Sequence, residues 1–343
     1  MTSLTALRRR LSAPILVLSA VLVSAIAGAP AAWTQSADDV HIVPGSRPDS
    51  DEASAVSPEL HARPLRKDVD LVLVPVTVSD AMNRPVINLT RQDFSLYENS
   101  VQQEIRFLSH EDAPMSIAFV LDCSASMKNK IEYEYQALQE FFSNANSEDE
   151  YLAVRVSDKP ELIATASDSI ATLQARIGSA SPRGRTALFD AIYLAISQLR
   201  NAHYKKRAVL IISDGGDNTS RYTRGEIKKV IEEADVLTYA IGIFDEEPIP
   251  LLKSIEERMG RNWLSELTDA SGGRTIAADE RRRIPEIAGI ISRELRNQYL
   301  LGYRPTNSVG EGRWRKITVK VGPVSPSMRL QVHYREGYRP PTE

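Results

Sequence analysis

The chain has 343 residues, of which 42% are hydrophobic and 25% charged, proportions that are ordinary for a folded globular protein. Its length suggests about two domains. The formal net charge of −3 argues against nucleic acid as a partner, because proteins that bind nucleic acid usually present a basic surface. Cys123 is the single cysteine, so no disulfide can form within the chain.

Residues 1–32 have the form of a secretory signal peptide. Arg8-Arg9-Arg10 precede an apolar stretch over Ala13–Ala29, and small residues follow in Ala29-Pro30-Ala31-Ala32. Such signals combine positive charge, a short apolar run and small residues at the cleavage site. An uncleaved membrane anchor is the alternative, although the run is shorter than the roughly 20 residues that cross a bilayer. We expect an exported protein, periplasmic or secreted, that contacts a membrane only through this segment if it is retained.

Cleavage would also change the charge of the protein. The three arginines would leave with the signal, so the formal net charge would fall from −3 to −6. Residues 33–65 follow; they are rich in Ser, Asp, Ala and Pro and show no sustained periodicity. Such a composition cannot bury enough apolar surface to fold. We expect a flexible linker there.

Short runs rich in β-forming residues occur at both ends of the remaining chain. Several alternate polar and apolar residues, as half-buried strands do; the runs are Val69–Val78, Leu89–Asn99, Gln103–Leu108, Asn297–Tyr303, Trp314–Val321 and Met328–Tyr334. Neither end alone has enough strands for a sandwich. We therefore expect residues 66–112 and 296–338 to close into one small β-sandwich, with a second domain, residues 113–295, inserted between them.

The inserted region alternates strands and helices. The predicted strands are Ser116–Leu121, Glu150–Val156, Leu162–Ala166, Arg207–Ser213, Val236–Ile243 and Arg274–Ala277; the predicted helices are Lys130–Ser143, Ser169–Gly178, Leu188–Asn201, Gly225–Ala234, Trp263–Ala270 and Ile284–Arg296. This order is typical of an α/β fold with a doubly wound, mainly parallel sheet covered by helices on both faces. The second and third strands are joined by a short turn, so they can pair as an antiparallel hairpin.

The first strand of this region ends in Asp122-Cys123-Ser124-Ala125-Ser126, which places one carboxylate and two hydroxyls on a single turn. Ligand crevices form at the carboxyl ends of strands in such sheets, and oxygen donors without Cys or His suit a hard divalent cation. Two later segments carry further oxygen ligands, namely Gly184–Ala191 with Thr186 and Val209–Gly215 with Asp214. A simpler interpretation, compatible with the first, is that the serines cap the following helix.

Together the three segments resemble a von Willebrand factor A-type domain with its metal-ion-dependent adhesion site. The resemblance implies a coordination set, direct or through water, of Asp122, Ser124, Ser126, Thr186 and Asp214. Mg²⁺ is the first candidate because it accepts few protein ligands and keeps waters, with Mn²⁺ and Ca²⁺ as alternatives. A narrower resemblance, to exported bacterial A-type-domain proteins common in acidobacteria, rests on Asp93–Asn99, Tyr299–Tyr303 and Arg335–Tyr338. It implies no known activity.

A site with two carboxylates and three neutral hydroxyls leaves a divalent cation able to accept another anionic oxygen. The resemblance implies that this oxygen comes from an Asp or Glu of a partner protein, in adhesion or in assembly of an envelope complex. Arg185 and Asp217 are candidates to contact that partner; a plain surface arginine and a solvated turn over Gly215–Asn218 are the alternatives. We expect Asp190 to cap or brace its helix.

An enzyme is the competing hypothesis, because an Asp beside Mg²⁺ can serve phosphoryl transfer or hydrolysis. The sequence contains neither a G-x-x-x-x-G-K-[ST] phosphate loop nor a G-x-S-x-G nucleophile motif. The five histidines are scattered outside the predicted site loops, so Cys123 lacks an evident base and is expected to be a packed residue. We therefore expect a binding module and not an enzyme. A purely structural domain that has lost its metal is the third hypothesis.

Overall fold

The computed structural model describes residues 71–110, 112–178, 182–244, 255–278, 280–306, 312–322 and 329–340. By internal contacts, Arg66–Glu343 is one compact unit. The predicted signal peptide and the predicted linker lie outside the described residues. Within the described part, no helix is both long and apolar enough to cross a membrane.

A six-stranded sheet in the order β10-β9-β8-β5-β6-β7 forms the centre of the inserted region. Its strands are β5 (Ser116–Asp122), β6 (Glu150–Val156), β7 (Glu161–Ala164), β8 (Arg207–Ser213), β9 (Leu237–Ile243) and β10 (Thr275–Ala278). All neighbours are parallel except β6 and β7, which pair antiparallel. Every residue of β5 and β9 is buried, as expected for strands covered on both faces. The predicted α/β fold and its edge hairpin are confirmed.

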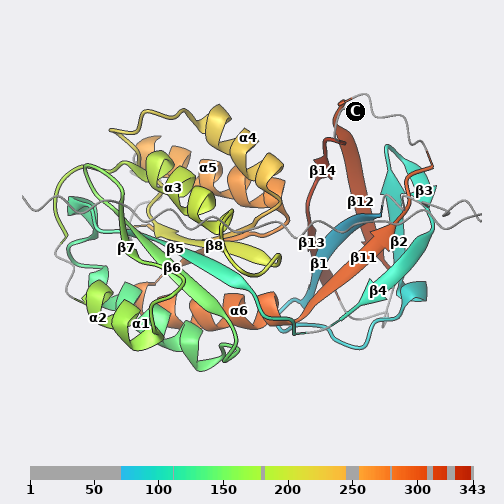
Figure 1. Cartoon of the computed structure of the whole chain (residues 1–343), viewed down its shortest axis with the longest axis horizontal. Coiled ribbons are helices and arrows are strands. Elements are labelled where there is room, and N and C mark those ends of the chain that lie inside the picture. Colours follow the sequence, from blue (N-terminus) through green and yellow to red (C-terminus); the bar gives the residue numbers. More distant parts are fainter. Residues whose placement is uncertain are drawn as a thin grey trace, which may run out of the picture. The chain divides into compact units, whose positions relative to one another are not determined.

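Three helices cover each face of this sheet (Figure 1). Helices α1 (Ile131–Ser143), α2 (Ile170–Gly178) and α6 (Ile284–Arg296) pack on one face, and α3 (Leu188–Leu199), α4 (Arg224–Ala234) and α5 (Ile255–Ser271) on the other. Successive side chains of β5 serve the two cores in turn, because side chains alternate across a strand: Phe119 lies in the first core and Val120 in the second.

Helix α5 is longer than the sequence predicted. The expected helix covered Trp263–Ala270, whereas α5 already begins at Ile255. Its first turns contain mostly polar residues and Gly260, so they lack the apolar periodicity from which a helix is predicted.

Strands from the two ends of the chain form two four-stranded sheets with a common core. One sheet has the order β13-β1-β11-β4, with β13 (Leu330–Tyr334), β1 (Val72–Asp80), β11 (Gln298–Tyr303) and β4 (Ile105–Ser109). The other has the order β14-β12-β2-β3, with β14 (Gly337–Tyr338), β12 (Arg315–Val321), β2 (Phe94–Glu98) and β3 (Val101–Gln103). Strand β1 lies between two strands from the carboxyl-terminal segment and is antiparallel to both. The β-sandwich built from both segments is therefore present (Figure 1).

A buried glutamate joins these two segments in the sandwich. The Glu98 carboxylate, at the end of β2, accepts hydrogen bonds from the hydroxyls of Tyr303 (2.6 Å) and Tyr338 (3.0 Å) and from the Arg315 guanidinium (3.1 Å). Glu98 is only 5% exposed. Its partners come from β11, β14 and β12, so one carboxylate links strands of both sheets. Such a buried charge stabilises only while its partners remain in place.

We expect Glu98→Ala to lower the free energy of unfolding by about 3 kcal/mol or more, because a buried guanidinium and two buried hydroxyls lose their shared acceptor. Urea unfolding of the variant and the wild type measures this. The matched control is Glu104→Ala, whose side chain is 77% exposed and forms an ion pair with the exposed Arg106; it should change stability by less than about 1 kcal/mol. Equal effects of the two variants would contradict a structural role for Glu98.

Buried polar contacts connect the sandwich to the α/β sheet. The Tyr239 hydroxyl of β9 lies 3.3 Å from the Thr77 hydroxyl of β1. Arg274 forms an ion pair with the buried Glu294 of α6 and also donates to Asn83 Oδ1 at 2.9 Å. At the end of α6, where the chain returns from the α/β region to the sandwich, Arg296 forms ion pairs with Asp149 and with Asp112. The points where the chain leaves and re-enters the sandwich are therefore tied together.

His333 of β13 lies in this contact region as a neutral imidazole. Burial, with a smaller effect of the nearby Arg274 charge, lowers its pKa from 6.5 to about 4. Its Nε2 is buried and has no hydrogen-bond partner among the described residues. Between pH 6.5 and about 4, His333 is therefore protonated in the unfolded chain but stays neutral in the folded chain.

We expect the free energy of unfolding to fall as the pH is lowered from 6.5 towards 4, by up to about 3 kcal/mol from His333 alone. Urea unfolding at a series of pH values measures this slope. In His333→Gln the part of the slope that belongs to His333 should disappear, and the difference between the two proteins should be constant above pH 7. A difference that does not change with pH would contradict the assignment.

Candidate metal centre at the carboxyl edge of the sheet

Asp122, the last residue of β5, is fully buried. Its Oδ1 accepts a hydrogen bond from the Ser124 amide (3.0 Å), and its Oδ2 accepts one from the Ser213 hydroxyl (2.6 Å). Burial and, second, the negative charge of Asp214 raise the pKa of Asp122 to about 6. The two carboxylates therefore lie close enough to repel one another. A cation between them would remove this repulsion.

The two serines of the signature follow on the same turn. The Ser124 and Ser126 hydroxyl oxygens lie 3.1 Å apart. Ser124 begins a short 3-10 turn, Ala125–Met127, but its side chain makes no capping hydrogen bond, and the residue that precedes α1 is Lys130. Helix capping therefore does not account for these serines. Their hydroxyls are gathered beside Asp122, as oxygen ligands of one site would be.

Thr186 is positioned by bonds between neighbouring loops. Its amide donates to Asn218 Oδ1 (3.0 Å), and its carbonyl accepts from the amides of Asn218 and Thr219. These bonds fix the backbone and leave the Thr186 hydroxyl out of them. Gly184, in the left-handed region with φ of +80°, turns the loop so that its carbonyl accepts from the Ala125 amide. The Thr186 loop is thereby held against the serine turn.

Asp214 follows β8, the strand beside β5. Its Oδ1 accepts a hydrogen bond from the Gly216 amide at 2.9 Å. Gly215, with φ of +79°, makes the turn possible, and a Cβ there would lie 2.8 Å from the backbone of Gly260 in α5. The turn therefore requires glycine both for its conformation and for its close approach to the helix.

Two further residues of this edge were not singled out from the sequence. Ser213 donates to Asp122 Oδ2 and accepts from the Gly215 amide (3.0 Å), so one hydroxyl joins the strand ends of β5 and β8. The sequence signal for Ser213 was its position as a polar residue at the end of an otherwise apolar strand. Glu134 of α1 is fully buried, and neither carboxylate oxygen has a partner among the described residues. Burial and, second, the charge of Asp122 raise its pKa well above the usual range.

Two aspartates lie behind the Thr186 loop. Asp217 is a candidate partner contact, with a solvated turn as the alternative; in the structure its Oδ2 accepts from the Phe189 amide at the start of α3 and from the Ser220 hydroxyl, so it caps this helix. Asp190, expected to cap or brace α3, accepts from the backbone of Arg221 and Tyr222 and from the Arg221 side chain. It braces the neighbouring loop. Arg185 is exposed and donates to the Asn218 carbonyl (2.9 Å).

The donor set fits a hard cation. It comprises two carboxylates and three hydroxyls from three adjoining loops, with no sulfur or imidazole. Among the described residues, no three His, Cys, Asp or Glu side chains are grouped to hold a metal, so any ion at this edge depends on the hydroxyls. Cys123 lies inside the loop but is buried, and burial raises the pKa of its thiol. A raised pKa keeps this thiol protonated, and the thiolate is the form that binds metals and acts as a nucleophile.

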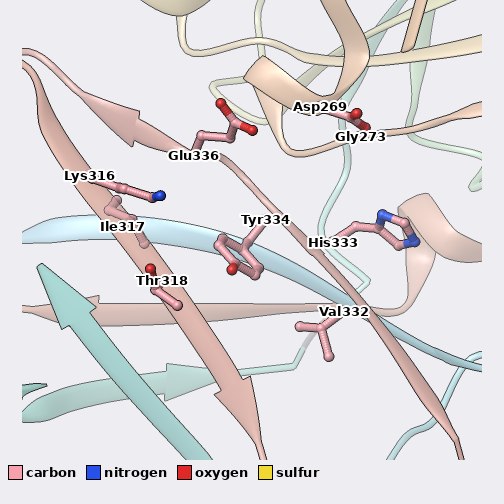
Figure 2. Close-up of a pocket in the computed structure, with 9 residues that line it drawn as sticks. All are labelled: Asp269, Gly273, Lys316, Ile317, Thr318, Val332, His333, Tyr334 and Glu336. Carbon is pink, nitrogen blue, oxygen red and sulfur yellow. The ribbon is translucent and has the colours of Figure 1, made fainter. Parts of the chain in front are cut away.

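A separate cavity of about 380 Å³ lies where β12 and β13 of the sandwich meet the end of α5 (Figure 2). Its polar lining includes Asp269, Glu336, Lys316 and Thr318. Burial, followed by the Glu336 charge, raises the pKa of Asp269. Neither carboxylate belongs to the predicted coordination set, so this cavity and the metal centre are different places.

Comparison with known proteins agrees with the fold and the order of the site segments. Residues 117–216 match the model of the von Willebrand factor type A domain family. This range contains all five predicted ligands and runs from β5 to just beyond β8. The chain therefore contains a von Willebrand factor A-type domain, as the resemblance in its sequence indicated.

One curated relative is an uncharacterised protein of Borreliella burgdorferi, 25% identical over 154 residues; the match covers 40% of this chain and 43% of the relative. Among solved structures, a von Willebrand factor type A protein from Catenulispora acidiphila is 12% identical, with a TM-score of 0.45 over 71% of this chain and 73% of that one. Proximal thread matrix protein 1 from mussel byssus, with a zinc-occupied adhesion site, is 16% identical, with a TM-score of 0.44 over 58% and 49%. These scores are low, and the assignment rests on the family match and the sheet itself.

We expect Gly215→Ala to weaken divalent-cation binding at least tenfold, because a Cβ strains the left-handed turn and meets the backbone of Gly260, which displaces Asp214. Calorimetric titration with Mg²⁺ measures this. The matched control is Gly225→Ala in the first turn of α4, where a Cβ would meet nothing within 4 Å. Wild-type affinity in Gly215→Ala would contradict the assignment of Asp214.

Proposed function

We propose that this protein binds a divalent cation at the carboxyl edge of its central sheet and uses it to dock an acidic side chain of a partner protein. The observation that supports this most directly is Asp122, a carboxylate buried beside Asp214 whose hydrogen-bond partners, the Ser124 amide and the Ser213 hydroxyl, are both neutral. Two ionised carboxylates side by side are unfavourable in a folded protein unless one takes up a proton or a cation joins them.

Asp122, Ser124, Ser126, Thr186 and Asp214 would hold the ion, directly or through water. Two carboxylates balance the charge of one divalent cation, and neutral hydroxyls orient it without adding negative charge. Mg²⁺ fits such an oxygen set best, with Mn²⁺ and Ca²⁺ as alternatives. When bound, the ion supplies a positive charge with an open position for a further oxygen ligand.

The position of the histidines supports a binding role over hydrolysis. His110 stacks on Tyr299 of the sandwich, His203 packs on Tyr204 ahead of β8, and His333 lies in β13. None of these three belongs to the loops that carry Ser124 and Ser126. A serine nucleophile needs an adjacent base, and these loops offer it no imidazole among the described residues. We therefore propose an interaction module that acts after export, in adhesion or in assembly of an envelope complex.

The test is metal binding by Asp122→Asn. We expect wild-type protein to be stabilised by about 2.7 kcal/mol when free Mg²⁺ exceeds its Kd a hundredfold, and Asp122→Asn to lose both this shift and the calorimetric heat. The metal-free variant should be at least as stable as the wild type, because a buried charge is removed, so misfolding will not explain the loss. Asp269→Asn, at the separate cavity, is the matched control and should bind normally.

Absence of heat and of a thermal shift with Mg²⁺, Mn²⁺ and Ca²⁺ in the wild type would refute the metal site. Docking is tested separately, by capture from an envelope extract with and without chelator. Wild type should retain a partner that is lost with chelator and in Thr186→Ala. Turnover of aryl phosphates or esters that requires both Mg²⁺ and Asp122 would instead identify an enzyme.

A further inference from the structure

Four exposed basic side chains lie on the loops that carry the predicted ligands. They are Lys128, Arg183, Arg185 and Arg221, called here the basic rim. The protein as a whole has a negative formal charge of −3. Its average composition therefore does not account for this local positive charge.

Hydrogen bonds place the rim residues around the metal centre. The Arg183 amide donates to the Cys123 carbonyl (2.9 Å), between two predicted ligands, and Arg185 directly precedes Thr186. Lys128 follows the Ala125–Met127 turn, two residues after Ser126. The Arg221 backbone and guanidinium both donate to Asp190 at the start of α3, and the Arg221 side chain is nevertheless 83% exposed. The rim is therefore built on the same connected loops as the site.

The acidic residues described on and beside these loops accept hydrogen bonds within the protein. Asp158, which is exposed and follows β6, accepts the Arg185 amide at 2.7 Å and lies against Gly184. Asp217 caps α3 and Asp190 braces the next loop. Asp122 and Asp214 face the metal position. Among the described residues of the ligand loops, the exposed charged side-chain ends are therefore cationic, and a bound divalent ion would add two further positive charges.

We propose, building on the proposed function, that the partner is a protein segment with several carboxylates, of which one reaches the metal and its neighbours contact the basic rim. Guanidinium groups recognise carboxylates in a fork that offers two parallel hydrogen bonds. Opposite charges around a docking point also accelerate association and select against basic partners. A single Glu or Asp in a neutral segment would bind the metal but would form no ion pairs with the basic rim.

The experiment uses immobilised synthetic peptides and the purified protein. One peptide carries a single Glu among Gly and Ser, and the second carries the same Glu flanked by additional Glu residues. Binding is measured by interferometry with Mg²⁺ or chelator, at low and high salt. The rim variant is Arg183→Gln/Arg185→Gln. Its matched control, Arg106→Gln/Lys320→Gln, removes two exposed positive charges from β4 and β12 of the sandwich.

We expect the multi-Glu peptide to bind more tightly than the single-Glu peptide, with an advantage that shrinks at high salt. The rim variant should weaken multi-Glu binding by about 4- to 25-fold, from roughly two- to fivefold for each exposed charge. It should leave single-Glu binding within about twofold of wild type, and the sandwich control should leave both peptides unaffected. Asp122→Asn should abolish binding of both peptides.

The outcomes separate the two proposals. Unchanged multi-Glu binding by the rim variant overturns the acidic-segment proposal, while loss in Asp122→Asn would still support metal docking. Multi-Glu binding that survives both chelator and Asp122→Asn overturns metal docking; equal binding to phosphatidylglycerol vesicles would then identify a general polyanion surface. If neither peptide binds although calorimetry shows bound Mg²⁺, the acidic-segment proposal is wrong and only the metal site stands.

Discussion

The architecture of the candidate metal edge follows from the burial of one carboxylate. Asp122 ends a strand whose neighbours on both sides are buried, so its charge has little access to water. Desolvation of an ionised carboxylate is costly unless polar groups or a cation replace the lost water. The adjoining loops supply two polar groups, the Ser124 amide from its own turn and the Ser213 hydroxyl from β8. The charge of Asp214 acts in the opposite direction and helps to raise the pKa of Asp122.

The same constraint explains the construction of the neighbouring loops. Gly184 and Gly215 both adopt positive φ, and each is approached so closely, by the Asp158 carboxylate and by the Gly260 backbone respectively, that a side chain would clash. These contacts let the loops close around Asp122. The cap of α3 by Asp217 and the brace by Asp190 fix the same loops from behind. Among the described residues of the ligand loops, the exposed charged side chains are basic, and this is the basis for proposing an acidic partner.

The sandwich gives the inserted domain a fixed attachment. Arg296, at the end of α6, pairs with Asp112 near the start of the insertion and with Asp149 ahead of β6, so entry and return of the chain are held at one point. Glu98 joins strands from both halves of the sandwich.

Local sequence patterns determined the central sheet, its edge hairpin and five of the six helices, because apolar periodicity and strand-ending polar residues reflect short-range physics. They also placed the ligand candidates on strand ends, and their order along the chain gave the family resemblance. The sequence did not reveal the first turns of α5, which are polar, or the bridging role of Ser213. Whether Asp217 faces solvent or caps a helix through an amide 28 residues earlier in the chain depended on loop packing, which no local pattern encodes. Tertiary structure alone decided the burial of Asp122 and Glu134 and the grouping of the rim, because desolvation and charge proximity arise only when distant segments meet.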